Sequence, residues 1–262
     1  MAPTLTPAAC GSDLAIQDVL DAVEDVLANQ DCHADTDRIY VAGVSGGGHM
    51  ALLLAARHPH RWAGVSAWAS IADLQAWWKE RSAQSDEPAY LQRYAKQVEA
   101  VAGGKPDGSQ PKAVNECGRR SPLTFLSPEL AGKVALDINA GIHDGRSGSV
   151  PFSHSLSAFA ALLPPSKQLA KSWISKFYQS QLCPDSERFS GADPLYEGRK
   201  LHYRSTHESS RVTIFEGGHE ILHGAALNWL SHQRRGKEAI WYIPTEAIDW
   251  TSTRIGQSES GR

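Results

Sequence analysis

One stretch of the chain, from Arg38 to Ala56, constrains the fold more than any other. It begins with a short continuous apolar run, typical of a parallel strand buried on both faces, and it ends in leucines and alanines that favour a helix. Between them lie Gly43, Ser45 and Gly47 in a Gly-x-Ser-x-Gly spacing. A strand that turns sharply into a helix strains the turn residue and crowds its neighbours, and glycines on either side relieve that crowding. The stretch therefore predicts a nucleophile elbow with Ser45 exposed at the end of a strand.

The residue after the serine has a predicted role of its own. A helix that starts here directs the Gly46 N–H toward any oxyanion that forms when Ser45 attacks a carbonyl. The alternative is a glycine-rich turn in which the serine is incidental. The strand before the turn and the helix after it are the context that an elbow requires, and they favour the catalytic interpretation.

The bulk composition argues against several classes of function. The chain has 262 residues, enough for one large domain or two small ones, and its net charge of −3 gives no basic excess for nucleic acid. No apolar run is long enough to span a bilayer. The four cysteines are widely spaced and form no cluster with histidine, so we expect no metal; one disulfide and free thiols both fit this spacing. The glycines near Ser45 lack a dinucleotide-binding spacing and a phosphate-loop lysine, so we expect no cofactor.

Strand and helix signals alternate along most of the chain. This alternation predicts an α/β fold with a mainly parallel sheet and helices on both faces. Predicted strands lie at 38–43, 62–68, 134–140 and 211–215, with shorter candidates at 201–203 and 238–243. Predicted helices begin at the cap Ser12 and after the elbow, and others lie near 153–163, 166–182 and 222–235.

Residues 69–130 interrupt this alternation. They contain helical pieces near 72–81 and 88–102 and a loop rich in glycine, proline, lysine and serine, but no strand signal. An insertion of this kind after a strand can form a cap over the site or can pack peripherally, and both interpretations stay open. We expect one catalytic domain over 1–243, with 69–130 as a cap-like insertion, and a C-terminal tail over 244–262 whose end is disordered.

Ser45 needs partners, because a free serine hydroxyl is a weak nucleophile: a base must activate it and an acid must orient the base. In a parallel α/β sheet these partners should follow the carboxyl ends of strands. Asp144 lies four residues beyond the predicted strand ending at Ala140, and His219 lies four residues beyond the one ending at Phe215. The order nucleophile, acid, base is that of α/β-hydrolases and not that of chymotrypsin or subtilisin.

Other residues compete for these roles. His223 lies one turn after His219 and is the alternative base, but only His219 directly follows a strand and its glycine turn. The acids that rank below Asp144 lie within a strand or in polar loops that follow no strand: Asp137, Asp185 and Asp193.

Three further residues are candidates for a substrate pocket. His49 lies in the elbow helix, His143 precedes the candidate acid, and Trp68 belongs to a group of four tryptophans between Trp62 and Trp78. Such tryptophans can form an apolar or sugar-stacking wall, although buried core aromatics are the commoner explanation.

Three motifs together resemble the catalytic domain of the prolyl oligopeptidase family, an α/β-hydrolase branch that also contains acyl-peptide hydrolases and esterase-like members. They are Gly-Val-Ser-Gly-Gly-Gly-His from Gly43, Gly-Ile-His-Asp-Gly from Gly141 followed by Val150-Pro151, and Gly-Gly-His-Glu from Gly217. The resemblance covers roughly residues 10–243. It implies that Ser45 is the nucleophile, Asp144 the acid, His219 the base and Gly46 one oxyanion donor. The gap between the aspartate and Val-Pro is longer here than is usual in the family.

The chain departs from the fold that this resemblance implies. Only 44 residues precede Ser45, too few for the several strands that normally come before the nucleophile, one of which is followed by a turn that supplies a second oxyanion donor. The strand at 38–43 would then lie at a sheet edge with unpaired backbone groups. We therefore expect either an N-terminally shortened form of a longer enzyme, or an oligomer or partner chain that covers the exposed edge.

Two functions follow from these observations. The first is a metal-independent serine hydrolase that acts on a small ester or short peptide; the second is a catalytically inactive remnant that serves as a binding module. Residues 1–9 lack a signal-peptide pattern, which predicts a cytoplasmic protein as written and leaves a secreted or periplasmic one open if the chain begins further upstream.

Overall fold

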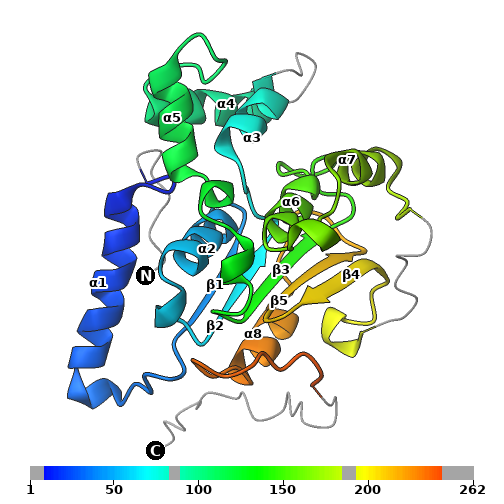
Figure 1. The fold of residues 1–262 in the computed structure, drawn as a ribbon. Coiled ribbons are helices and arrows are strands. Elements are labelled where there is room, and N and C mark those ends of the chain that lie inside the picture. The colour runs from blue at the N-terminus through cyan, green and yellow to red at the C-terminus, as the bar shows by residue number, and fades with distance from the viewer. Residues whose placement is uncertain (1–8, 83–88, 185–192, 244–262) are drawn as a thin grey trace, which may run out of the picture.

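The structure is a computed structural model, and it describes residues 9–82, 89–184 and 193–243. A five-stranded sheet with the order β1-β2-β3-β5-β4 forms its centre (Figure 1). The strands are Tyr40–Val44 (β1), Gly64–Trp68 (β2), Leu136–Gly141 (β3), Leu201–His207 (β4) and Ser210–Phe215 (β5). The helices are Asp13–Ala28 (α1), Gly46–Arg57 (α2), Leu74–Ser82 (α3), Ala89–Ala102 (α4), Pro111–Arg120 (α5), Ser153–Ala161 (α6), Lys171–Ser180 (α7) and His223–Ser231 (α8).

The sheet is parallel except for β4, which runs antiparallel to β5. The register of the parallel strands places four residues side by side in one row across the sheet: Val44 pairs with Trp68, Trp68 with Asn139, and Asn139 with Thr213. The carboxyl ends of β1, β3 and β5 therefore meet at the same edge of the sheet. This architecture confirms the predicted α/β class with a mainly parallel sheet.

Burial separates the central strands from the outer ones. Every residue of β2, β3 and β5 is buried, as expected for parallel strands covered on both faces, whereas β1 and β4 are only partly buried. Within the described residues β1 pairs with β2 alone. The strand predicted at 38–43 thus lies at the edge of the sheet, as its position in the chain suggested.

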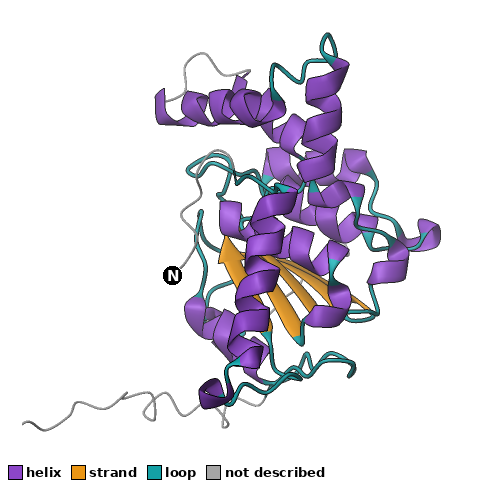
Figure 2. Ribbon diagram, turned by 90° about the vertical axis from the view of Figure 1, so that its left-hand side faces the viewer, coloured by secondary structure: helices purple, strands orange, loops and turns teal. Residues whose placement is uncertain are grey.

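Helices cover both faces of the sheet (Figures 1 and 2). On one face, α2 and α6 contribute Leu52 and Phe159 to the larger apolar cluster. On the other face, α8 places Trp229 in a second cluster with Trp68 and Phe215. The sheet is therefore the middle layer of three.

Helices α3, α4 and α5 form a group with its own apolar cluster, which includes Trp77, Val98 and Cys117. Figure 1 shows this group at one end of the molecule, beyond the carboxyl end of β2. The helices predicted near 72–81 and 88–102 are present, and α5 is a helix that the sequence pattern did not indicate. A capping role for this group stays a prediction.

One predicted strand is absent. Residues 238–243 form no strand, because the side chain of Gln233 takes the place of a neighbouring strand: its Oε1 accepts from Ile240 N–H and its Nε2 donates to Ile240 C=O. The predicted C-terminal tail, residues 244–262, lies outside the described residues. No helix in the described part of the chain combines the length and the apolar composition needed to cross a bilayer.

Candidate active site

The turn after β1 has the strained geometry of a nucleophile elbow. Ser45 has φ 59° and ψ −122°, in the left-handed half of conformational space that side-chain-bearing residues rarely occupy. A Cβ on Gly43 would lie 2.3 Å from the carbonyl oxygen of Gly47, and one on Gly48 would lie 2.4 Å from the carbonyl oxygen of Trp68. A Cβ on Gly47 would meet nothing within 4 Å. The crowding therefore requires glycine at 43 and 48, whereas we had expected it at 43 and 47.

The backbone around Ser45 leaves a donor free at the start of α2. Ser45 N–H donates to Trp68 C=O at 2.9 Å, which fixes the turn to the end of β2. The first hydrogen bond of α2 runs from His49 N–H to Ser45 C=O, so the Gly46 amide has no partner within the helix. An oxyanion on an acyl group attached to Ser45 could accept from this amide.

Asp144 and His219 are in direct contact. His219 Nδ1 lies 2.9 Å from both carboxylate oxygens of Asp144, whose side chain is fully buried. Asp144 Oδ1 also accepts from the amides of Gly145 (2.9 Å) and Val150 (3.2 Å). Because a carboxylate can only accept, Nδ1 carries the proton and Nε2 presents its lone pair. This is the tautomer that a general base requires.

The hydroxyl of Ser45 makes no hydrogen bond to His219 in this structure. In the described part of the chain it has no hydrogen bond, and His219 Nε2 instead lies 3.4 Å from Ser149 Oγ. All three candidate residues follow parallel strands at one edge of the sheet. The strand β2 lies between β1 and β3, which puts the starting points of Ser45 and Asp144 about 10 Å apart. The loop after β5 packs against the end of β3, where His143 N–H donates to Gly217 C=O at 3.0 Å.

A network that sequence reasoning missed holds the loop that carries His219. Glu216 accepts from His202 Nε2 (2.8 Å) and from His143 Nε2 (2.6 Å), and these hydrogen bonds, led by that of His202, lower the pKa of Glu216. Glu220 accepts from Arg199 (2.8 Å) and from Gly218 N–H (3.0 Å). The loop is thus anchored on both sides of His219. No spacing in the sequence indicates these contacts, because they join separate strands and loops.

The rival residues have other partners. His223 is exposed at the first turn of α8, and the base in contact with the buried acid is His219. Asp137 is 1% exposed and pairs with Arg211 Nε at 2.8 Å. Asp193 pairs with Arg204, and Asp185 lies outside the described residues.

Two of the three candidate pocket residues are buried. His49 is 2% exposed and its Nε2 donates to Arg120 C=O at 2.7 Å, so it makes a hydrogen bond inside the fold. Trp68 is completely buried between Tyr196 and Phe215. His143 is half-exposed beside the acid loop and stays a candidate for contact with substrate.

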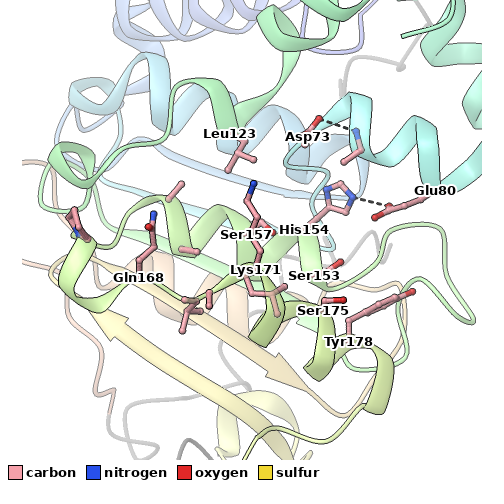
Figure 3. Close-up of a pocket in the computed structure, with 17 residues that line it drawn as sticks. Asp73, Glu80, Leu123, Ser153, His154, Ser157, Gln168, Lys171, Ser175 and Tyr178 are labelled. Carbon is pink, nitrogen blue, oxygen red and sulfur yellow. Dashed lines mark hydrogen bonds and ion pairs between the residues drawn. The ribbon is translucent and has the colours of Figure 1, made fainter. Parts of the chain in front are cut away.

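A cavity of about 760 Å³ lies between α3, α6 and α7 (Figure 3). Its wall includes His154, which joins Glu80 of α3 at 3.0 Å, and Tyr178 of α7. None of the candidate triad residues is among the described residues that line it.

Solved structures of peptidases show limited similarity to this chain. Acylaminoacyl peptidase from Pyrococcus horikoshii is 20% identical with a TM-score of 0.41, over 58% of this chain and 21% of that one. Prolyl oligopeptidase B from Galerina marginata is 20% identical with a TM-score of 0.42, over 63% of this chain and 22% of that one. The chain thus spans about a fifth of the length of each. A comparison with curated protein sequences found no match.

The family comparison covers more of the chain. The profile of the prolyl oligopeptidase family matches residues 13–172, which is more than half of the sequence and includes the elbow and the candidate acid. This chain belongs to the prolyl oligopeptidase family of serine hydrolases.

Proposed function

We propose that the protein cleaves an ester or peptide bond through an acyl-enzyme, with Ser45 as nucleophile, His219 as general base and Asp144 as the acid that orients it. The observation that carries this proposal is the contact between His219 Nδ1 and the buried carboxylate of Asp144, which makes Nε2 the proton-accepting nitrogen of the imidazole. The strained turn at Ser45 and the family membership support it.

In the proposed first half-reaction, His219 Nε2 takes the proton of Ser45 while the serine oxygen attacks the substrate carbonyl. The Gly46 N–H donates to the oxyanion of the tetrahedral intermediate. His219 then delivers the proton to the leaving alcohol or amine, and the acyl group stays on Ser45. Asp144 stabilises the imidazolium that exists between these transfers.

In the second half-reaction, water replaces the leaving group. His219 removes a proton from water as it attacks the acyl-enzyme, and returns that proton to Ser45 as the acid product departs. For both steps the Ser45 hydroxyl has to come within hydrogen-bonding distance of Nε2, a contact that often tightens only when substrate binds.

The substrate class is proposed from the family. Membership implies peptide substrates, but esters and amides pass through the same tetrahedral species, so the triad alone does not separate them. A panel of short-acyl esters and aminoacyl-arylamides would rank the two. We expect replacement of Ser45 by alanine to lower kcat on the best substrate by about 10⁶, and unchanged turnover would contradict the proposal.

A second candidate function is a binding module without catalysis. The observations that favour it are the Ser45 hydroxyl without a hydrogen bond to His219 and the partly buried edge strand β1. A fluorophosphonate reagent separates the two functions, because it bonds covalently only to an activated serine. Labelling that disappears with Ser45→Ala supports the enzyme, and a folded sample that takes up no label supports the binding module.

A further inference from the structure

The loop from Asp144 to Val150 brings a second hydroxyl to the candidate base. Ser149 Oγ lies 3.4 Å from His219 Nε2, the nitrogen that the proposed mechanism uses to activate Ser45. Ser149 is 7% exposed, so its side chain is enclosed by protein. The proposed function assigns this residue no role.

The position of Ser149 is fixed by the backbone on both sides. Its carbonyl accepts from Trp77 Nε1 of α3 at 2.8 Å, and the next amide, that of Val150, donates to Asp144. The preceding residue, Gly148, packs so closely that an added Cβ would lie 2.3 Å from Asp144 Oδ1 and 2.6 Å from His219 Cβ. The loop therefore packs against both Asp144 and His219, and the Ser149 side chain points at the imidazole.

The chemistry of the imidazole defines what this contact can be. Because the Nδ1–H group donates to Asp144, Nε2 is unprotonated and carries a lone pair. The Ser149 hydroxyl donates to this lone pair. Ser45 needs the same lone pair when it gives up its proton. The two hydroxyls therefore compete for one acceptor, and in this structure Ser149 occupies it.

We propose that Ser149 is a positioning residue that holds the free imidazole of His219 in its resting orientation and is displaced when Ser45 reacts. The inference rests on the proposed triad. At 3.4 Å the hydrogen bond is at the long limit of such contacts, so it restrains the base without blocking it. A neutral hydrogen bond of this kind slows the first attack by about 2- to 10-fold.

The test is the second-order rate of fluorophosphonate labelling at Ser45, which reports the attack step alone. Ser149→Ala removes the competing hydroxyl, and we expect labelling to be about 2- to 10-fold faster than in the unmodified protein. Ser147→Ala is the matched control, because Ser147 lies in the same loop but its hydroxyl contacts the His143 carbonyl. This control should label at the unmodified rate.

A second pair of variants removes the effect of packing. Ser149→Thr and Ser149→Val have nearly the same volume and differ in the hydroxyl. We expect the valine variant to label about 2- to 10-fold faster than the threonine variant. A merely structural role would slow both variants alike, and it would not accelerate either of them.

The outcomes separate this inference from the proposed function. If the unmodified protein labels at Ser45 but the alanine and valine variants are no faster than their hydroxyl-bearing counterparts, the role of Ser149 is wrong and the triad stands. If the unmodified protein does not label at Ser45, the triad is wrong and the role of Ser149 is overturned with it.

Discussion

The carboxylate of Asp144 is fully buried and meets the Nδ1 of His219 with both oxygens at 2.9 Å. Two backbone amides, those of Gly145 and Val150, also donate hydrogen bonds to it. All of these groups donate to the carboxylate, and the contact with Nδ1 fixes the tautomer of the imidazole.

The first prediction concerns the hydrogen-bonded carboxylate of Asp144. Asp144→Asn replaces an oxygen by an NH₂ donor, which favours the wrong tautomer of His219 and leaves Nε2 protonated. We expect kcat to fall by about 10³- to 10⁴-fold, measured on the best substrate of the ester and arylamide panel. The melting temperature should be recorded alongside. A folded variant that keeps most of its activity would contradict the role of Asp144.

The second prediction concerns the buried ion pair between β3 and β5. Arg211 Nε donates to Asp137 Oδ1 at 2.8 Å, and both side chains are at most 4% exposed. Asp137→Ala leaves a buried guanidinium without its counter-charge, and we expect the free energy of unfolding to fall by about 3–5 kcal/mol. Denaturant titration measures this loss. A matched change at the surface pair, Asp35→Ala beside Arg234, should shift the denaturant midpoint far less than Asp137→Ala does.

The third prediction is a pH dependence of stability. Burial lowers the pKa of His49 to about 4, below its ordinary value of 6.5. Between these two values the unfolded chain binds a proton that the folded chain does not, so the contribution of His49 is complete above pH 6.5 and is lost as the pH falls toward 4. The loss amounts to about 3 kcal/mol.

The control for this effect is His49→Gln, whose amide can still donate to Arg120 C=O but does not titrate. Denaturant midpoints measured from pH 7 to pH 4 should fall less steeply for this variant than for the unmodified protein. Parallel curves for the two proteins would show that His49 does not contribute to the acid sensitivity.

Much of this fold could be predicted from local pattern. The strands expected at 38–43, 62–68 and 134–140 are present as β1, β2 and β3, α1 begins at its Ser12 cap, and the elbow combines a strand, a glycine turn and a helix. The contact between Asp144 and His219 was expected because both follow parallel strands, and the structure brings them together. Signals of this kind lie within a few neighbouring residues.

The features that were missed depend on contacts between distant segments. Helix α5 contains Asn115 and Gly118, which are poor helix formers, and it is supported by packing against α3 and α4. The strand expected at 238–243 is replaced by the side-chain contacts of Gln233. The carboxylate of Glu216 between two histidines and the approach of Ser149 to His219 likewise exist only in three dimensions.

The most direct test of the central claim is to locate the site of fluorophosphonate labelling by mass spectrometry of the folded protein. The account predicts one modified residue, Ser45, and no modification in the Ser45→Ala variant. Labelling that persists in that variant, or a folded protein that takes up no label, would contradict the assignment of Ser45 as the nucleophile.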